Sequence, residues 1–220
     1  MSDAIRVGLV GFGYASKTFH APLIGGTPGM ALKAVASSDA DKVHADWPGV
    51  KVMSAPGDLL DDPDIDLVVI ATPNDTHFPL AKAALEAGKH VVVDKPFTVT
   101  LSQARELESL AKHCGRILSV FHNRRWDSDF LTVSALINEG QLGEVCYFES
   151  HFDRFRPQVR QRWREQAGPG SGIWYDLAPH LLDQVVVLFG LPVSITVDLA
   201  QLRPGAQSTD YFHAVLAYPQ

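Results

Sequence analysis

The chain has 220 residues, of which 46% are hydrophobic and 20% are charged, and its formal net charge is −6. This composition is typical of globular domains and leaves room for one large domain or two modest ones. The negative charge argues against nucleic-acid binding, and the longest apolar run, near residues 185–188, is too short to span a membrane. We expect a cytoplasmic protein in which Cys114 and Cys146 are reduced thiols, because their spacing fits no metal or redox motif.

A buried strand over residues 5–10 is predicted to lead into a glycine-rich loop with the pattern G-x-G-x-x-small. Gly11 permits the tight turn, Gly13 lets the backbone approach a pyrophosphate, and Ser16 keeps the contact between helix and strand close. The free N–H groups at the start of the following helix would hold phosphates. The loop therefore predicts a dinucleotide site.

The tip of the second predicted strand, residues 31–37, bears on the choice of cofactor. An acidic residue there grips the ribose 2′-OH of NAD, whereas this chain has Ser37 and Ser38, with Lys42 one turn later. Hydroxyl groups beside a cation leave room for a 2′-phosphate, which favours NADP. Two alternatives stay open: Asp39 can reach back to the ribose of NAD, or the serines can be a simple helix cap.

Two further buried strands end in polar residues. Residues 67–71 lead into a turn containing Thr72, Asn74 and His77, and the valine-rich strand that starts at residue 90 ends at Asp94-Lys95-Pro96. Helices over 79–87 and 102–112, followed by a strand over 116–121, complete an alternation that predicts a parallel sheet. Ligands bind at the carboxyl edge of such sheets, although Lys95 can also be an ordinary surface lysine in a loop.

The pattern changes after Phe121, so we expect a dinucleotide-binding domain over residues 1–121 and a second, α+β domain over 122–220. Predicted elements of the second domain are a helix over 127–138, a strand over 145–155, a helix from close to Asp176 to Gly190, and strands over 193–202 and 211–217. The strand over 145–155 would place Tyr147, Glu149, His151 and Asp153 on one face, as an exposed surface or a cleft. Their spacing does not suit a metal site.

Two further features of the second domain carry chemistry. Asp176 and His180 are four residues apart, so on one helical face the carboxylate can orient the imidazole; alternatively, Asp176 only caps the helix. Five arginines fall within residues 154–164, and such a segment predicts either a site for a small anion or a solvated face.

The series formed by Gly11-x-Gly13, Thr72-Pro73-Asn74 with His77, Asp94-Lys95-Pro96 and Asp176-x-x-x-His180 resembles the signature of the Gfo/Idh/MocA (glucose–fructose oxidoreductase/inositol dehydrogenase) family. The stretches 122–127 and 174–183 resemble its bacterial scyllo-inositol-dehydrogenase-like branch. Asp94 stands where most members have Glu, and Ser16 where many have Gly or Ala. Members usually carry a complete second domain on a large, mostly antiparallel sheet that mediates oligomerisation, so the resemblance implies a C-terminally truncated chain that forms a dimer or tetramer.

The resemblance also implies roles for individual residues. The catalytic group would be Lys95, Asp176 and His180. The cofactor-binding residues would be Gly11, Phe12 and Gly13 at the pyrophosphate, Ser37, Ser38 and Lys42 at the adenosine ribose, and Thr72, Asn74, His77, Asp94, Asn123, Trp163 and Arg164 at further contacts.

The implied activity is hydride transfer between NADP or NAD and a secondary alcohol of a sugar or cyclic polyol. Two alternatives remain. A retained cofactor could drive glycosidic elimination through transient oxidation, or the protein could be a non-catalytic dinucleotide-binding sensor. The presence of Lys95, Asp176 and His180 together argues against the sensor, because binding alone requires none of them.

Overall fold

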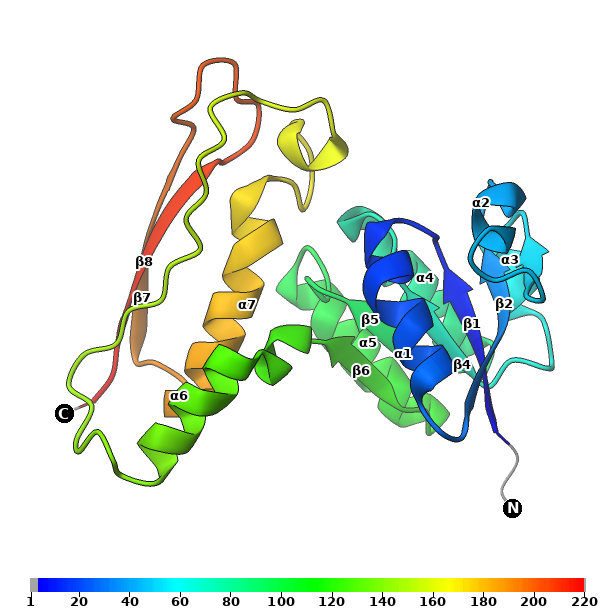
Figure 1. Cartoon of the computed structure of the whole chain (residues 1–220), viewed down its shortest axis with the longest axis horizontal. Coiled ribbons are helices and arrows are strands. Elements are labelled where there is room, and N and C mark those ends of the chain that lie inside the picture. The colour runs from blue at the N-terminus through cyan, green and yellow to red at the C-terminus, as the bar shows by residue number, and fades with distance from the viewer. Residues whose placement is uncertain (1–3, 220) are drawn as a thin grey trace. The chain divides into compact units, whose positions relative to one another are not determined.

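The computed structural model describes residues 4–219 and divides the chain into two compact units, Met1–Phe121 and His122–Gln220. The first unit contains a six-stranded parallel sheet in the order β3-β2-β1-β4-β5-β6 (Figure 1). This order and the alternating helices confirm the predicted Rossmann-type sheet. The strands are β1 (Ile5–Val10), β2 (Met30–Ala36), β3 (Lys51–Met53), β4 (Leu67–Ile70), β5 (His90–Asp94) and β6 (Leu118–Phe121).

Helices cover both faces of this sheet, because successive β-branched residues of its strands point to opposite sides. One core joins Val68 and Ile70 of β4 to residues of α3, α4 and α5, and the other joins Val69 to residues of α1 and α2. The helical elements of the unit are η1 (Ser16–His20), α1 (Ala21–Gly26), α2 (Ala40–His44), α3 (Pro56–Leu60), η2 (Asn74–Thr76), α4 (His77–Glu86) and α5 (Leu101–Cys114).

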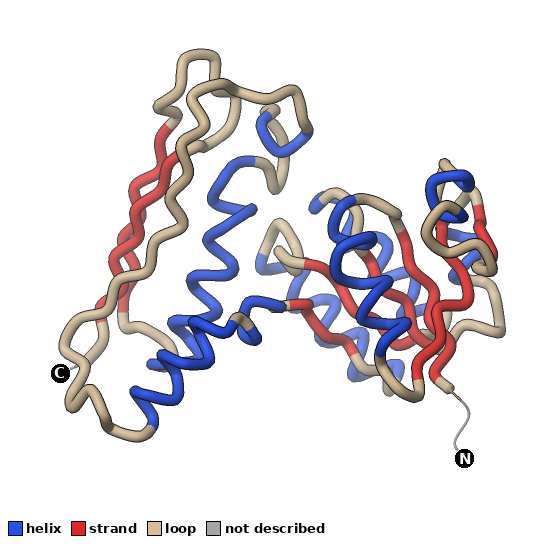
Figure 2. Tube along the Cα trace, viewed as in Figure 1, coloured by secondary structure: helices blue, strands red, loops and turns tan. Residues whose placement is uncertain are grey.

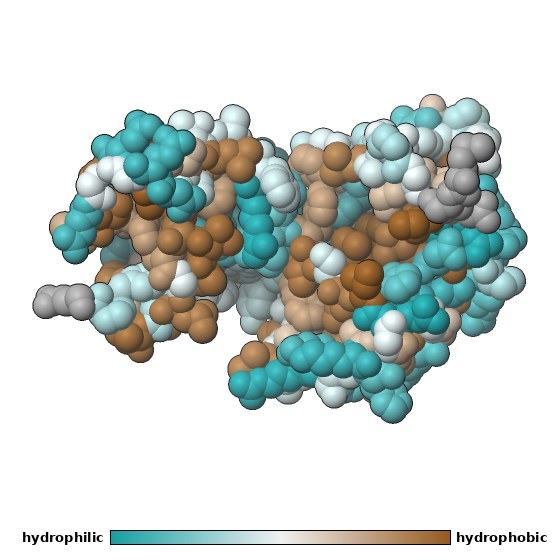
Figure 3. Space-filling view, turned by 90° about the horizontal axis from the view of Figure 1, so that it is seen from below, coloured by the Kyte–Doolittle hydropathy of each residue, from teal (hydrophilic) through white to brown (hydrophobic). Residues whose placement is uncertain are grey.

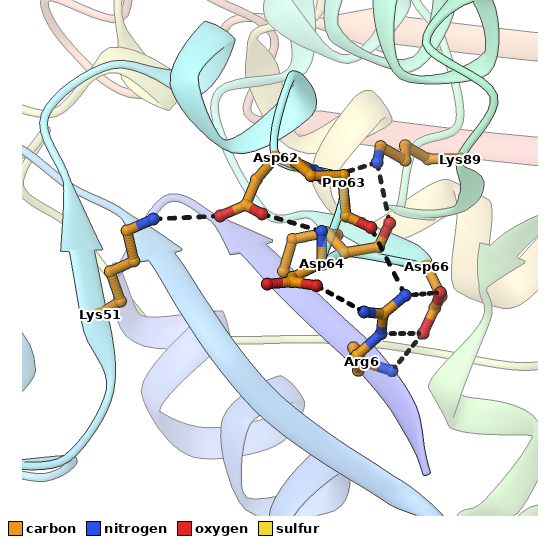
Figure 4. A network of polar contacts seen from close by, with 8 residues as sticks. Arg6, Lys51, Asp62, Pro63, Asp64, Asp66 and Lys89 are labelled. Carbon is orange, nitrogen blue, oxygen red and sulfur yellow. Dashed lines mark hydrogen bonds and ion pairs between the residues drawn. The ribbon is translucent and has the colours of Figure 1, made fainter. Parts of the chain in front are cut away.

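An ionic network braces the amino-terminal ends of the strands (Figure 4). The guanidinium group of Arg6, on β1, donates to both oxygens of Asp66, just before β4, at 2.9 and 2.7 Å. The amine of Lys89 donates to the carbonyl oxygens of Asp62 and Ile65 at 2.7 and 2.9 Å. Hydrogen bonds from Arg6 hold the pKa of Asp66 at about 2. The network ties β1, β4 and the start of β5 together at the edge opposite the glycine loop.

The second unit contains an antiparallel pair of strands and a long helix. Ser194 of β7 pairs with Ala217 of β8, and the helix contacts β8 through the edge-to-face rings of Trp174 and Phe212, 5.5 Å apart. Its elements are η3 (Asn123–Trp126), α6 (Ser128–Asn138), η4 (Trp163–Glu165), α7 (Gly172–Phe189), β7 (Ser194–Ala200) and β8 (Tyr211–Ala217). No helix within residues 4–219 is long and apolar enough to cross a membrane.

The predicted strand over residues 145–155 is wrong, since this stretch is an extended loop (Figure 2). A strand needs a ladder partner for its backbone groups, and among the described residues β7 and β8 pair only with each other. The side chains still alternate: Phe148 packs on Phe189 at 5.4 Å, while Tyr147 and His151 are exposed. The alternation was visible in the sequence, but the missing pairing was not.

The predicted start of the helix near Asp176 is also wrong, because α7 begins at Gly172 and Pro179 lies inside it. A proline removes one helical hydrogen bond, so the sequence alone favours placing Pro179 within the first turn. The helix start is instead fixed by a long-range bond, in which the N–H of Ile173 donates to the carbonyl oxygen of Thr209 at 2.7 Å. Leu177 and Ala178, which directly precede Pro179, are buried, and their packing helps to offset the lost bond.

Candidate functional site

The glycine loop lies between the carboxyl ends of β1, β2 and β4. Gly11 has φ +89°, and its N–H donates to the carbonyl oxygen of Ala36 at 2.9 Å. A Cβ at Gly11 would lie 2.7 Å from the carbonyl oxygen of Ala71, so only glycine fits there. The hydroxyl of Ser16, fully buried, donates to the carbonyl oxygen of Gly11 at 2.8 Å and fixes the helix against the loop.

Gly13 differs from Gly11 in being exposed and open. A Cβ built there meets no atom within 4 Å, so its backbone is free for a ligand to approach. Its carbonyl oxygen accepts the N–H of Lys17 at 3.1 Å, at the start of the helical segment that runs to Gly26. Phe12 between the two glycines is buried in the core, so only its backbone faces outward.

At the tip of β2, Asp39 is committed to its own helix. Its carboxylate accepts the N–H of Lys42 at 3.0 Å and caps α2, so the cap is Asp39 and not the serine pair. The hydroxyl of Ser37 donates to the carbonyl oxygen of Asp39 at 3.2 Å, and Ser38 is exposed. The surface after the end of β2 therefore carries the hydroxyl groups of Ser37 and Ser38 and, on α2, the exposed Lys42.

After β4, the predicted polar cluster forms the next part of the edge. The hydroxyl groups of Thr72 and Thr76 lie 2.6 Å apart, and Asn74 is buried. His77 is only 1% exposed, and its ring nitrogens lie 2.8 Å from the carbonyl oxygen of Pro96 and 3.0 Å from that of Thr72. In this arrangement His77 joins the ends of β4 and β5. Thr72 is more accessible to a ligand than Asn74 or His77.

Asp94 and Lys95 follow β5, and their surroundings include a histidine that we did not predict. One carboxylate oxygen of Asp94 accepts the N–H of Lys95 at 2.7 Å, and the other lies 3.3 Å from Nε2 of His20. His20 is 3% exposed and packs on the ring of Phe121, with centroids 4.2 Å apart. Burial alone would raise the pKa of Asp94, but the hydrogen bond and charge of His20, with those of Lys95, lower it.

His20 escaped prediction because it is separated from Asp94 by 74 residues. The local signal is a histidine on the buried side of the helical segment that follows the glycine loop. In the structure it holds the carboxylate that precedes Lys95, and so orients the backbone on which Lys95 is carried.

The predicted residues of the second unit gather at the start of α7. Asp176 is half-buried, and its carboxylate lies 3.4 Å from Nε of Arg164. The guanidinium group of Arg164 also lies over the ring of Trp163, 4.6 Å from the centroid. His180, one turn after Asp176, is 6% exposed. Asn123 begins η3, where the carbonyl oxygen of Arg124 accepts a hydrogen bond from Gln184 of α7 at 2.9 Å.

The structure thus sorts the predicted residues into two sets, one in each unit. In the first unit, Gly11, Gly13, Thr72 and Lys95 follow the carboxyl ends of the neighbouring strands β1, β4 and β5. The order of strands reverses at β1 and β4, which is where open parallel sheets bind dinucleotides. In the second unit, Trp163, Arg164 and Asp176 lie together, with His180 on the same helix.

Comparison with known proteins agrees with this architecture. Residues 5–122 match the family model described as "Oxidoreductase family, NAD-binding Rossmann fold", and residues 134–220 match "Oxidoreductase family, C-terminal alpha/beta domain". The Escherichia coli protein YdgJ, named as an uncharacterized oxidoreductase, is 80% identical over all of this chain and 64% of its own length. The Bacillus subtilis scyllo-inositol 2-dehydrogenase (NADP(+)) IolW is 39% identical over 98% of this chain and 60% of its own length.

The solved structure of YPO2259 from Yersinia pestis has a TM-score of 0.93 and 70% sequence identity, and it covers all of this chain and 62% of that one. The chain therefore spans about three-fifths of the length of these relatives. Both family models match in the order found in the fold, and together they cover most of the chain. The chain belongs to the Gfo/Idh/MocA family of oxidoreductases.

Proposed function

We propose that the protein is an NADP-dependent oxidoreductase that transfers a hydride between the nicotinamide and a secondary alcohol or ketone of a sugar or cyclic polyol. The observation that carries the proposal is the carboxyl edge of the first unit. It has an open backbone at Gly13 beside a glycine turn at Gly11. In the same sheet, Lys95 follows the end of β5, which β4 separates from β1. A binding protein would need the glycines but not Lys95, and an enzyme would need both.

The residues present fit a dinucleotide. The space that a Cβ would fill at Gly13 is empty, so a pyrophosphate can approach the N–H groups at the start of the helix. Ser37, Ser38 and Lys42 would hold the adenosine ribose. The preference for NADP over NAD is supported by the engagement of Asp39 in capping α2 and by the cofactor in the name of IolW.

When bound, the nicotinamide accepts or returns the hydride. In the oxidation direction, His180 would take the proton of the substrate hydroxyl, and Lys95 would stabilise the developing alkoxide. Asp176, one turn before His180 on α7, would orient the imidazole. General acid–base assistance of this kind is worth about 10² to 10⁴ in rate.

The test is to supply the chain with NADP and a panel of inositols and sugars, and to follow reduced nicotinamide by absorbance. We expect turnover with at least one polyol, accompanied by release of the reduced cofactor into solution. If cleavage of a glycoside occurs without released cofactor, elimination with a retained dinucleotide is the correct activity. Binding of NADPH without turnover of any compound would instead indicate a sensor.

The protein is further proposed to form a homo-oligomer, a dimer or tetramer, through the sheet of the second unit. Val215 and Tyr211 of β8 are 55% and 42% exposed, and Ile195 of β7 is 47% exposed. The surface of the second unit carries apolar patches in Figure 3. Light scattering tests this proposal, and a strictly monomeric mass at high concentration would contradict it.

A further inference from the structure

The second unit contains a cavity of about 350 Å³, which is within the size range of small-molecule sites. It lies between the start of α7, the loop around residues 152–157, η4 and the connection from β7 to β8. Leu177 and Ile173 form part of its apolar wall. Its charged lining is dominated by five arginines, namely Arg154, Arg156, Arg162, Arg164 and Arg203.

Three carboxylates also line the cavity, and each is already paired with an arginine. Glu165, 7% exposed, lies 2.9 Å from Arg162 and 3.1 Å from Arg203. Asp210 accepts hydrogen bonds from the side chain and the backbone N–H of Arg203 at 2.8 and 3.1 Å. These carboxylates fix Arg162 and Arg203 in place, so this part of the cavity lining is held in one arrangement.

Asp176 is the third carboxylate, and Arg164 is 3.4 Å from it. The three carboxylates thus pair with Arg162, Arg164 and Arg203, which leaves the positive charges of Arg154 and Arg156 unbalanced by any carboxylate of the lining. Among residues 4–219, neither side chain makes a hydrogen bond or an ion pair with a carboxylate. Burial, followed by the charges of neighbouring arginines, lowers the pKa of Arg156. Like charges held together in this way repel one another, and an anion between them would relieve the repulsion.

This concentration of positive charge stands out in a chain whose net charge is −6. Guanidinium groups are flat, always charged and suited to two-point hydrogen bonding of carboxylate and phosphate oxygens. We propose that this cavity recognises an anionic group, a carboxylate or a phosphate, on a hydroxylated substrate. The assignment rests on the proposed function, because Asp176, one of the proposed catalytic residues, lines the same cavity.

In this arrangement Arg154 and Arg156 bind the anionic group, and the apolar wall contacts the carbon skeleton. The oxidised hydroxyl then lies on a different carbon from the one that bears the anion. The substrate class becomes a sugar acid, a carboxylated cyclic polyol or a phosphorylated polyol, and a neutral polyol of the same size binds more weakly.

The experiment is calorimetric titration of the chain in low-chloride buffer with D-glucuronate, glucose 6-phosphate, inorganic phosphate and neutral D-glucose. The same titrations are made on the R154Q/R156Q double variant and on R160Q. Arg160 belongs to the same segment and does not line the cavity, so R160Q, which removes one of the two positive charges that the double variant removes, controls for loss of charge beside the cavity. Because the two cavity arginines repel each other, the double variant should fold at least as stably as the parent, which thermal denaturation verifies.

We expect an anionic sugar to bind at least about tenfold more tightly than glucose, and the double variant to weaken that binding by about 10- to 100-fold. R160Q should stay within about twofold of the parent. Glucuronate alone identifies a carboxylate site, and glucose 6-phosphate alone identifies a phosphate site. Equal binding of glucose and the anionic sugars, an equal loss in R160Q, or binding of inorganic phosphate alone would overturn the inference.

NADPH is titrated against the same three proteins in parallel. If sugar binding does not depend on Arg154 and Arg156 while all three proteins bind NADPH, only the cavity assignment is rejected. Absence of NADPH binding to every protein would reject the proposed function, and it would then limit the cavity to anion binding without a redox role.

Discussion

The two glycines of the loop allow stability and ligand binding to be separated by a matched pair of substitutions. In Gly13→Ala the new methyl group meets no atom within 4 Å, so the fold has no reason to change. Alanine also has a smaller unfolded-state entropy than glycine, so stability should stay the same or rise by about 0.5 kcal/mol. The methyl group would occupy the space through which a pyrophosphate approaches the backbone. We therefore expect NADPH to bind at least about tenfold more weakly.

Gly11→Ala should instead destabilise the fold. Its Cβ would lie 2.7 Å from the carbonyl oxygen of Ala71 and 3.0 Å from Cγ2 of Thr72, at a φ of +89°. The backbone strain costs about 1–2 kcal/mol, and the contact with a carbonyl raises the total to about 2–4 kcal/mol. For a unit of this size, the melting temperature should fall by roughly 8–15 °C.

The assays are thermal denaturation for both variants and calorimetric titration with NADPH for those that remain folded. We expect Gly11→Ala to have a lower melting temperature, and Gly13→Ala to have a normal melting temperature and weak NADPH binding. Tight NADPH binding by Gly13→Ala would refute the view that the open backbone at Gly13 is a pyrophosphate site. A normal melting temperature for Gly11→Ala would refute the steric argument.

Four further predictions concern the edge of the sheet and its bracing. Lys95→Met should lower turnover by about 10²- to 10⁴-fold with NADPH binding unchanged, and normal turnover would exclude the proposed role. Ser38→Asp should weaken NADPH binding by about tenfold without weakening NADH binding, through repulsion of the 2′-phosphate; equal losses for both would contradict it. His20→Phe should lower the unfolding free energy by about 1.5–3 kcal/mol because it removes a hydrogen bond from the partly buried carboxylate of Asp94, whereas His20→Gln, which can still donate, should recover part of the stability and turnover. Asp66→Asn should lower the unfolding free energy by about 1 kcal/mol near neutral pH, after allowance for solvent screening of this partly exposed pair. The pKa of Asp66 is lowered from 3.8 to about 2, so its contribution is present above 3.8 and is lost as the pH falls through about 2. Chemical denaturation of parent and Asp66→Asn at stepwise lower pH should show the difference between them shrinking, and a constant difference would disprove the assignment.

The sequence predicted the first unit well because its signals are local. Runs of β-branched residues between glycine and proline mark strands that are buried on both faces, and this unit is built almost entirely from them. The short edge strand β3, Lys51–Met53, and the helix α3 that follows were missed. Three residues with one lysine carry too little periodicity to be distinguished from a loop.

The failures came from long-range contacts. The start of α7 depends on a bond from Ile173 to Thr209, and the loop over 145–155 lacks a strand partner among the described residues. The pairing of His20 with Asp94 joins a helix to a strand end across 74 residues. Similarly, the five arginines near residue 160 are visible in the sequence, but Arg203 and Asp210, which help to organise the cavity, come from elsewhere in the chain. Local patterns cannot report which distant residues meet.

The central claim is that the first unit binds a dinucleotide and prefers NADP, and calorimetric titration of the chain with NADPH and with NADH tests it most directly. We predict saturable binding of both at one site per chain, with NADPH bound more tightly. Tighter binding of NADH would contradict the assignment of Ser37, Ser38 and Lys42 to a 2′-phosphate and would point to Asp39. Binding of neither, by a chain whose circular dichroism shows a folded α/β protein, would contradict the claim itself.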